Sequence, residues 1–574
     1  GLTGALFKEF AFTLAGAVIV SGVVALTLSP VMSSLLLKSQ ASEGRFAHAV
    51  EHRMERLTAG YSRLLDHTLA ARPIVLMVGG AALIAIVILF SGAKRELSPI
   101  EDQGYVYVQL RAPQYASLDY TMRYTREVEK IFHTMPEYSS SFFNTGGPSG
   151  VNNAFGGIHM KEWSERSRSA DEVQSALYAA GSRLDGVRMS AFQPPALPAS
   201  SGGLPVQMVL RSPADFSQVY EAMETVKAAA RKSGLFVFVD SDLAFDAPEA
   251  RIVVDQAKAG EIGVTMKDIA DTLALLVGEN YVNRFNFHDR SYDVIAQVRR
   301  EDRLTPDNLG DFYVKTASGA LVPLATVVRF EMRPQANRLP QFNQMNAATL
   351  SAVPAPGVTM GQAVTFLQSQ PLPPGATIDW LGDSRQYVEE GNRLTISFGF
   401  ALVVIFLVLA AQFESLRDPL VILVTVPLAV CGALLPLYLG YTTLNIYTQI
   451  GLVTLIGLIS KHGILMTAFA NDLQLREGLD RVAAIRKASA IRMRPILMTT
   501  AAMVTGLIPL LFADGAGARS RFAIGIVVVM GMLIGTLFTL FVLPTIYTFV
   551  ARDHRASAAS ARERELADLK PAHA

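Results

Sequence analysis

The sequence predicts an α-helical membrane bundle of seven transmembrane helices that carries a large α+β insert of ferredoxin-like βαβ subdomains. Hydrophobic residues make up 50% of the 574 residues and charged residues only 18%, whereas soluble domains usually carry about 25% charge. The apolar residues are concentrated in nearly uncharged runs, each close to the 20 or so residues that a bilayer-spanning helix needs. One long stretch, 93–395, contains no such run and has the composition of a soluble domain.

Seven segments have the length and composition of a span: 11–37, 73–92, 396–413, 419–440, 445–470, 495–513 and 522–550. Short cytoplasmic loops carry an excess of Lys and Arg, and these residues gather at 38–72, 476–494 and 552–564. Alternation through seven spans places all three stretches on the cytoplasmic side, so the N-terminus and the insert are expected on the other side. The chain begins with Gly1 and would enter its first span from outside without a signal peptide. We therefore expect it to be the C-terminal part of a longer polytopic protein.

The stretch 41–71 has apolar residues at helical spacing with basic residues between them. The apolar residues are Phe46, Val50, Met54, Leu57, Tyr61, Leu64 and Leu65. This pattern predicts an amphipathic helix on the cytoplasmic face of the bilayer. The alternative is a plain connector helix.

The insert alternates strand-like and helix-like patterns. Predicted strands lie at 104–110, 139–143, 155–160, 188–192, 205–211, 235–240 and 250–255, and predicted helices at 117–134, 169–184, 214–232 and 266–277. This order is that of βαβ units of the split, ferredoxin-like kind. Segment 281–298 predicts a long hairpin with a polar tip, and the Gly/Pro/Ser-rich stretches 146–150 and 193–205 predict loops.

A charged residue lies deep in the fifth span. Lys461 is more than two turns from either end of that span, where a lysine costs about 2.5–3.5 kcal/mol and needs a partner or water. His462 adds a second titratable group, and Thr499 at the start of the sixth span could hydrogen-bond a polar group on a neighbouring helix. No acidic residue lies deep in any span, so we expect the counter-ion of Lys461 on helices outside this chain.

Two predicted strands of the insert present side chains suited to amphiphilic ligands. Tyr105, Tyr107 and Gln109 share one face of the first strand. Val206 and Met208 share a face of strand 205–211. A mixed aromatic, thioether and amide surface can bind amphiphiles with little directional bonding; ordinary sheet core is the alternative for each residue.

Other classes of function lack support. The net charge is +1, so no nucleic-acid-binding surface is implied. The single cysteine, Cys431, excludes an intrachain disulfide and a CxxC motif. The sequence has no P-loop, HExxH or GxSxG motif and no clustered metal ligands, so we expect neither an enzyme nor a metal site.

Several motifs together resemble one family. They are TLSPVMSSLLLK within 10–38, LSPIEDQG at 97–104, YVN at 281–283, LAAQFES at 409–415, and the segments 457–473 and 492–499. With these motifs, the chain resembles the C-terminal half of a resistance–nodulation–division (RND) efflux permease of the hydrophobe/amphiphile, multidrug class, essentially from end to end.

The resemblance implies proton-driven antiport of amphiphilic compounds by the inner-membrane permease of a tripartite pump. The expected partners are a periplasmic adaptor protein, an outer-membrane channel protein and two further copies of the permease in a homotrimer. The expected location is the bacterial inner membrane, with the insert in the periplasm. No cofactor is expected, since the proton gradient supplies the energy.

The resemblance also implies roles for particular residues. Lys461, Thr499 and Arg492 match the family's proton-relay positions, and the paired aspartates of that relay belong to the first half of the family's chain. His462 stands where the family's pumps often have Asn. The phenylalanine-rich loop of those pumps is shorter here and retains Phe143 as a substrate-binding candidate, while Asp240 and Asp242 make the neighbouring cleft more acidic.

The resemblance divides the chain into a series of parts. They are a transmembrane helix (1–40), an amphipathic helix (41–72), a transmembrane helix (73–92), porter subdomains (93–246), a funnel-like docking subdomain with hairpin 281–298 (247–335), a return to the porter (336–392), a five-helix transmembrane region with the proton relay (393–551) and a cytoplasmic tail (552–574). Two alternatives remain: a metal-ion exporter of the related RND class, and a membrane-anchored periplasmic binding module without transport.

Overall fold

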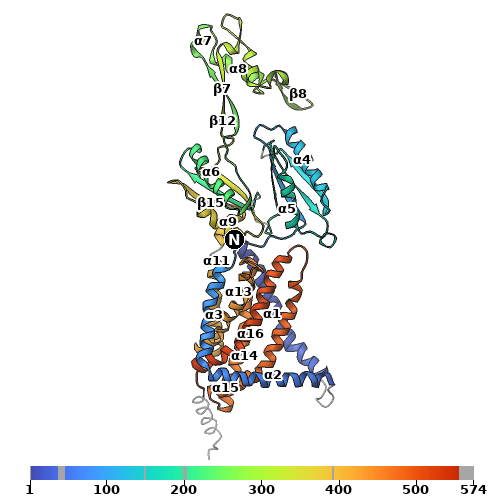
Figure 1. Ribbon diagram of the computed structural model, residues 1–574, viewed down its shortest axis with the longest axis vertical. Helices are drawn as coiled ribbons and strands as arrows, with labels where there is room; N and C mark the ends of the chain where they lie inside the picture. Colours follow the sequence, from blue (N-terminus) through green and yellow to red (C-terminus); the bar gives the residue numbers. More distant parts are fainter. Residues whose placement is uncertain (1, 37–44, 148–149, 198–202, 391–392, 555–574) are drawn as a thin grey trace, which may run out of the picture.

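The computed structural model describes residues 2–36, 45–147, 150–197, 203–390 and 393–554. Figure 1 shows three tiers along the long axis: a helical bundle, two sheets side by side above it, and a smaller tier with a hairpin at the far end. Parts of the predicted span 11–37, helix 41–71, loops 146–150 and 193–205 and tail 552–574 lie outside the described residues.

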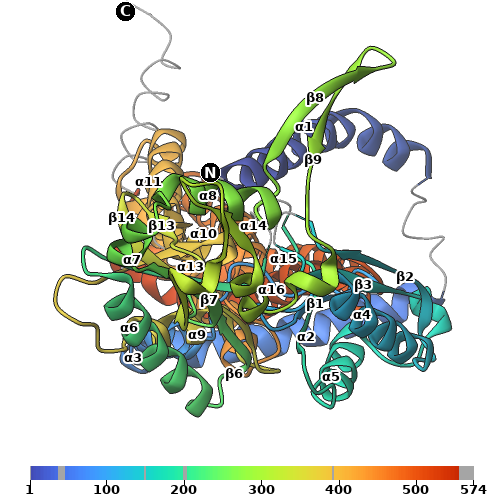
Figure 2. The same cartoon turned by 90° about the horizontal axis from the view of Figure 1, so that it is seen from above.

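The bundle consists of long apolar helices. They are α1 (Leu2–Leu36), α3 (Arg72–Gly92), α11 (Arg393–Phe413), α12 (Arg417–Leu423), α13 (Thr425–Tyr438), α14 (Ile446–Glu477), α15 (Arg481–Leu511) and α16 (Ala518–Val550). Among the described residues, six helical segments are long and apolar enough to cross a membrane, with α12 and α13 counted as one, and α11 adds a shorter apolar stretch at Phe398–Phe413. The chain is therefore a helical membrane protein with a β-containing insert. Seen from above, α1 stands apart from the other helices (Figure 2).

Small residues allow the central helices to approach closely. A Cβ on Gly535 would lie 2.7 Å from the Cβ of Ala429, and one on Gly432 would lie 2.6 Å from the Cβ of Ile534. Both glycines lie on the contact between α13 and α16, where a larger side chain would force the two helices apart.

The basic stretch 476–494 is not the loop that the sequence predicts. Arg476 lies in the last turn of α14, which ends at Glu477, and α15 begins at Arg481, so only three residues separate the two helices. Asp480 accepts hydrogen bonds from the amides of Val482 and Ala483 and so caps α15. Arg492 therefore lies inside a continuous helix.

Helix α2 (Arg45–Ala70) crosses the lower end of the bundle in Figure 1. Its residues Tyr61, Leu65 and Leu69 are buried against the bundle, and the Tyr61 hydroxyl donates a hydrogen bond of 2.7 Å to the Leu540 carbonyl. The helix is amphipathic, and its apolar face packs on protein at these three positions.

The first sheet of the insert has the predicted elements. They are β1 (Tyr105–Arg111), α4 (Leu118–His133), β2 (Tyr138–Thr145), β3 (Asn153–Met160), α5 (Ala170–Gly181) and β4 (Arg188–Phe192). The strands lie in the order β2-β3-β1-β4 and all neighbours are antiparallel. Ser117 caps α4, and Ser169 forms a capping box with Glu172 at the start of α5. Both helices cover one face and bury Val106, Val108 and Leu110.

The second sheet differs from the prediction. Strand β5 (Val206–Ser212) lies between β14 (Met345–Pro354) and β15 (Thr377–Leu381), and β6 (Phe236–Ser241) pairs with β14. Helices α6 (Phe216–Lys232) and α9 (Met360–Gln368) pack on the same hydrophobic core, and α10 (Gly382–Glu390) follows β15. Strand β7 (Ala247–Val254), predicted within the same repeat, pairs instead with β12 (Val328–Gln335). The second repeat is thus completed by strands more than 100 residues downstream.

The far tier contains α7 (Gln256–Glu261), α8 (Met266–Leu276), β8 (Tyr281–Phe287), β9 (Arg290–Ile295), β10 (Tyr313–Lys315) and β11 (Leu321–Pro323), with 3-10 turns at Arg300–Arg303, Pro306–Asp311 and Leu324–Thr326. Strand β13 (Gln341–Phe342) pairs with β14 at the edge of the second sheet, and a further 3-10 turn at Trp163–Glu165 follows β3. Strands β8 and β9 form the predicted hairpin, and every residue in them is exposed. Figure 2 shows the hairpin reaching outward over α1.

Two adjacent acids in the 97–104 motif connect the bundle to the first sheet. Glu101 is buried and accepts hydrogen bonds from the Ser520 amide at 2.6 Å and the Arg519 amide at 3.2 Å, at the start of α16. Asp102 accepts from the Ala170 amide at 2.9 Å and from Arg166 at 2.6 Å, at the start of α5. One dipeptide therefore joins the N-termini of two helices in different tiers.

Candidate functional site

The predicted relay residues lie on neighbouring faces of the bundle. Lys461 is the sixteenth of the 32 residues of α14, about 24 Å from the far end of that helix at 1.5 Å per residue. Its side chain is exposed on the surface of the bundle and has no ion-pair or hydrogen-bond partner among the described residues. A lysine in the middle of an apolar helix needs a partner or water. The exposed side of α14 at Lys461 is therefore where we expect a carboxylate or water to contact the ammonium.

His462, the next residue, is fully buried and connects three helices. Its Nε2 lies 3.3 Å from Thr499 Oγ1 on α15, and its Nδ1 lies 3.5 Å from Thr536 Oγ1 on α16. The Thr499 hydroxyl donates to the Ile496 carbonyl at 2.9 Å, so it accepts from His462. This assigns the proton of the neutral imidazole to Nε2 and leaves Nδ1 as an acceptor. Thr536 has one hydroxyl proton and two neighbouring acceptors, His462 Nδ1 and Thr500 Oγ1, so it donates to one of them at a time.

The network continues to a second threonine of α15. Thr500 Oγ1 lies 3.0 Å from Thr536 Oγ1, and both side chains are buried. Buried hydroxyls with partners on adjacent helices fix the rotation of those helices relative to each other. The structure thus brings His462 and Thr499 into contact and adds Thr536 and Thr500, which the sequence analysis did not single out.

Arg492 lies apart from this network. Its guanidinium lies over the ring of Phe469, 4.4 Å from the ring centroid, which is a cation–π contact. Its buried Nε has no hydrogen-bond partner among the described residues. Arg492 and Thr499 are seven positions apart along α15, or about 10 Å.

The face of the first sheet opposite α4 and α5 carries a row of aromatic side chains. Phe142, Gly157, Tyr107 and Phe192 are cross-strand neighbours in that order. The ring centroid of Tyr107 lies 6.4 Å from that of Phe142, 6.0 Å from that of Phe192 and 5.2 Å from that of Phe155 in the adjacent row. A Cβ on Gly157 would lie 3.0 Å from the Tyr107 ring, so the glycine leaves the space that this ring occupies.

The other predicted residues of strand β1 share this face. Tyr105 is exposed and stacks on His159, with ring centroids 4.4 Å apart, while Gln109 is half-buried. The three residues Tyr105, Tyr107 and Gln109 therefore form one face, while Val106 and Val108 point into the core.

Three predicted binding residues lie away from the aromatic face. Phe143 points to the helix-covered side, where its ring stacks on that of Phe132 at 5.5 Å. Val206 and Met208 are fully buried in the core of the second sheet beneath α6. A ligand-binding role for these three side chains stays a prediction, and their positions in the two sheet cores do not favour it. Phe142, the neighbour of Phe143, occupies the aromatic face.

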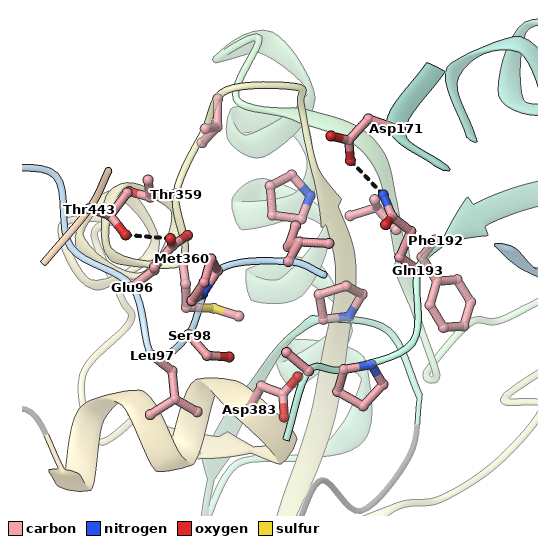
Figure 3. Close-up of a pocket in the computed structure, with 18 of the residues that line it drawn as sticks. Glu96, Leu97, Ser98, Asp171, Phe192, Gln193, Thr359, Met360, Asp383 and Thr443 are labelled. Atoms are coloured by element: carbon pink, nitrogen blue, oxygen red, sulfur yellow. Dashed lines mark hydrogen bonds between the residues drawn. The ribbon is translucent and has the colours of Figure 1, made fainter. Parts of the chain in front are cut away.

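A cavity of about 530 Å³ lies where the two sheets meet the bundle. Its walls come from the 94–100 segment, α5, the ends of β4 and β14, and the starts of α9 and α10, and they include the buried edge of Phe192. Figure 3 shows the acids Glu96, Asp171 and Asp383 on different sides of this space. The volume is within the range of small-molecule sites, roughly 300–1,000 Å³.

A second cavity, of about 510 Å³, lies between the insert and the upper ends of α3, α11, α13 and α14. Glu96 lines both cavities, and burial raises the pKa of its carboxyl although Thr443 donates a hydrogen bond to it. Across the described part of the chain, no group of three or more His, Cys, Asp or Glu residues is placed to hold a metal ion.

The carboxylates of Asp240 and Asp242 both have partners within the insert. Asp240 accepts from Arg111 at 2.7 Å and from Arg188 at 2.6 Å, which joins the two sheets. Asp242 accepts from the Thr349 amide at 2.6 Å, and burial raises the pKa of its carboxyl. The acidity that the sequence predicts for this cleft is therefore partly neutralised by arginines of the first sheet.

Comparison with known proteins gives consistent matches over nearly the whole chain. A family model described as the AcrB/AcrD/AcrF family matches residues 1–551. An "Uncharacterized transporter" of Haemophilus influenzae is 44% identical over 564 residues, which cover 97% of this chain and 55% of that protein. The "Multidrug resistance protein MdtF" of Escherichia coli O6:H1 is 30% identical over 567 residues, covering 96% of this chain and 55% of that protein.

A third relative is the "Toluene efflux pump membrane transporter TtgB" of Pseudomonas putida. It is 28% identical over 573 residues, which cover 96% of this chain and 54% of that protein. The chain thus spans about half the length of the curated relatives it matches.

Proposed function

The chain belongs to the AcrB/AcrD/AcrF family, and we propose that it takes part in proton-driven export of amphiphilic compounds from the bacterial cell. The relatives include proteins named for multidrug resistance and for toluene efflux. The observation that carries the proposal is the position of Lys461, an exposed ammonium in the middle of an apolar 32-residue helix and next to a buried network that joins α14 to α15 and α16.

Proton movement acts on Lys461 through its electrostatic attraction to carboxylates. We place these carboxylates on helices outside the 574 residues, facing the exposed side of α14. While they are ionised they attract the ammonium, and when they take up protons the attraction ends. A proton that moves through 100 mV releases about 2.3 kcal/mol, which can bias an element that has two arrangements.

His462 links that change to the neighbouring helices. Because Lys461 and His462 are consecutive on α14, a shift of α14 alters the geometry at Thr499 and Thr536. Those contacts are long, at 3.3 and 3.5 Å, so small displacements decide whether they form. Thr499 and His462 are thus the proposed coupling residues, and Arg492 is proposed to stabilise charge near one end of the path.

The insert supplies the proposed substrate path. The aromatic face around Tyr107 offers several rings at stacking distance, which suits ligands of varied shape. Tyr105 and Gln109 extend this face, and the cavity of about 530 Å³ adjoins it at Phe192. The substrates proposed are therefore amphiphilic small molecules.

We further propose the architecture and location that go with this activity. The bundle is proposed to have seven spans in the inner membrane, with the insert in the periplasm as ferredoxin-like porter sheets (93–246 and 336–392) and a docking tier (247–335). The exposed hairpin β8–β9 suits contact with another copy in a homotrimer. A periplasmic adaptor and an outer-membrane channel complete the proposed tripartite pump, which uses the proton gradient and no cofactor.

The test is transport in proteoliposomes that hold the assembled transporter under an imposed pH gradient. The proposal expects dye efflux from the vesicle interior that depends on the gradient and stops when a protonophore collapses it. Efflux that persists at the same rate without a gradient would contradict proton coupling.

A further inference from the structure

The cavity of about 530 Å³ is lined by one carboxylate, that of Asp383, which no neighbouring cation neutralises. Leu97, Phe192, Val353 and Met360 supply apolar surface, and five prolines of the adjoining loops add to it. Figure 3 shows these walls around a common space, with Asp383 beneath and Asp171 above. The cavity is therefore largely apolar and has a small number of polar groups.

Most charges around the cavity are paired. Arg519 forms an ion pair with Asp171, which also accepts a hydrogen bond of 2.6 Å from Gln193. Glu96 accepts from Thr443, and Lys94 donates to the Gly357 carbonyl at 3.1 Å. These contacts satisfy both cations and two of the three acids that line the space.

Asp383 is the exception. Among the described residues, no hydrogen-bond donor and no cation contacts its carboxylate. The adjacent Ser384 is fully buried and accepts from the Gln207 amide at 3.0 Å, and this bond fixes the start of α10 against β5. Asp383 is thus held at the cavity wall by a rigid neighbour, and no described protein group binds its oxygens.

The carboxylate of Asp383 is mainly ionised at neutral pH. Burial raises the pKa of Asp383 to about 6. Its position in the first turn of α10 favours the charged form. A half-buried carboxylate without a partner is costly, and a ligand that brings a cation removes that cost.

We propose that this cavity binds organic cations, with a protonated amine or quaternary ammonium group against Asp383 and the apolar part of the molecule against Leu97, Phe192 and Met360. This inference rests on the proposed function, because it names the substrate class that the exported compounds include. Glu96 does not take this role, since Thr443 already donates to it and burial favours its neutral form.

A pair of probes with the same fluorophore tests the charge requirement. Trimethylammonium-diphenylhexatriene is a permanent cation, and diphenylhexatriene is its neutral counterpart. Binding of each probe to the purified, assembled transporter is measured by fluorescence anisotropy, and efflux of each is measured from cells. The variant Asp383→Asn keeps the shape of the side chain and removes its charge, and Asp383→Glu keeps the charge.

Asp379→Asn is the matched control. Asp379 lies four residues earlier on β15, forms an ion pair with Arg211 at 3.3 Å and does not line the cavity. We expect Asp383→Asn to weaken binding of the cationic probe by on the order of tenfold and to leave the neutral probe unchanged. Asp383→Glu should restore most of the affinity, and Asp379→Asn should bind both probes as the wild type does.

The results separate this inference from the proposed function. Equal effects of Asp383→Asn on both probes, or no effect on either, would overturn the cation site. Loss of cation binding together with an absence of efflux of either probe by the wild type would support the site and overturn the export function.

Discussion

His462 Nε2 lies 3.3 Å from Thr499 Oγ1, a contact that joins the middle of α14 to α15. The same ring reaches Thr536 on α16 with its other nitrogen. One side chain therefore connects three helices, and it is the sequence neighbour of the exposed Lys461. Because Lys461 and His462 are consecutive, a displacement of Lys461 also moves the ring that connects the three helices.

The first prediction concerns Lys461. Lys461→Ala should abolish proton-driven efflux, because the charge on which the carboxylates act is gone. Lys461→Arg should also fail, since a planar guanidinium does not replace a compact ammonium. Folding should be retained in both, because the side chain is exposed in this chain. Efflux in proteoliposomes under a pH gradient measures the effect.

Lys487→Ala is the control for that experiment. Lys487 pairs with Glu477 at 2.6 Å near the ends of α15 and α14, and surface pairs of this kind contribute little stability. It should transport normally. Near-normal efflux by Lys461→Ala would show that this lysine has a structural role only.

The second prediction concerns His462→Leu. The substitution removes both contacts of the ring while roughly keeping its volume. Thr499 retains its bond to the Ile496 carbonyl and Thr536 its bond to Thr500, so the loss of unfolding free energy should be only about 1–2 kcal/mol. Efflux should fall much more than stability. A transporter that melts earlier but pumps at the wild-type rate would contradict the coupling role.

The third prediction concerns Met208→Ala. Met208 is fully buried between α6 and the second sheet, so the substitution leaves a cavity and should cost about 2–5 kcal/mol. Thermal melting of the purified protein measures this loss. The ratios between efflux rates of different compounds should not change. Altered ratios with an unchanged melting temperature would show that Met208 is a binding residue.

The fourth prediction concerns Tyr107→Ala. Tyr107 is half-buried and its ring lies at the centre of the aromatic face. Its removal should change the relative export of aromatic and aliphatic compounds, because stacking contacts contribute to the binding of the first class only. The measurement is susceptibility to a panel of both classes. Tyr138→Ala, on the strand β2 of the same sheet but outside the aromatic row, is the control.

The fifth prediction is a pH dependence of stability. Burial raises the pKa of Asp383 from an ordinary value of 3.8 to about 6, so its charge destabilises the folded protein. The destabilisation is absent below pH 3.8, grows between 3.8 and 6, and is complete above 6. Asp383→Asn should therefore raise the melting temperature at pH 8 and have no effect near pH 3.5. The charged groups around Asp383 that line the cavity are Lys94, Glu96, Asp171 and Arg519.

Asp102→Asn should change the melting temperature in the opposite direction to Asp383→Asn. Burial acts to raise the pKa of Asp102, but the hydrogen bonds from Arg166, Ala170 and Gly104 outweigh it, so the pKa lies below its usual value. The charged form then stabilises the fold above pH 3.8, and this stabilisation is lost as the pH falls through the folded-state pKa. Asp102→Asn should lower the melting temperature at pH 7 and have less effect as the pH falls. A similar response of both variants at pH 8 would contradict the assignments.

The sequence predicts most elements of the first sheet because local signals set their bounds. Period-two alternation locates β1, and Ser117 and Ser169 mark where α4 and α5 begin. The second sheet was only half predicted. Strands β14 and β15 complete it from beyond the far tier, and pairing between distant segments leaves no local pattern.

The site residues also divide into those with a local signal in the sequence and those without one. The cost of placing a charge within a bilayer identifies Lys461 from sequence alone, and His462 is the next residue. The sequence does not distinguish Phe142 from Phe143, because which side of a strand faces the helices depends on how the sheet is covered. The sequence does not identify Thr536 and Asp383, because their importance comes from contacts, or the lack of them, with residues far away in the sequence.

The Glu101–Ser520 contact allows a tilt of α16 to be transmitted from the bundle to the insert. Thr536, which meets His462, and Ser520, which is bonded to Glu101, are sixteen residues apart on one continuous helix without an intervening proline. That separation is about 24 Å, so a tilt of about 5° around the histidine end would displace the other end by about 2 Å. The neighbouring Asp102 holds the start of α5, so this displacement would turn the first sheet and change the width of the gap that faces the second. A small rotation at the imidazole would thereby become a displacement of about 2 Å at the base of the first sheet.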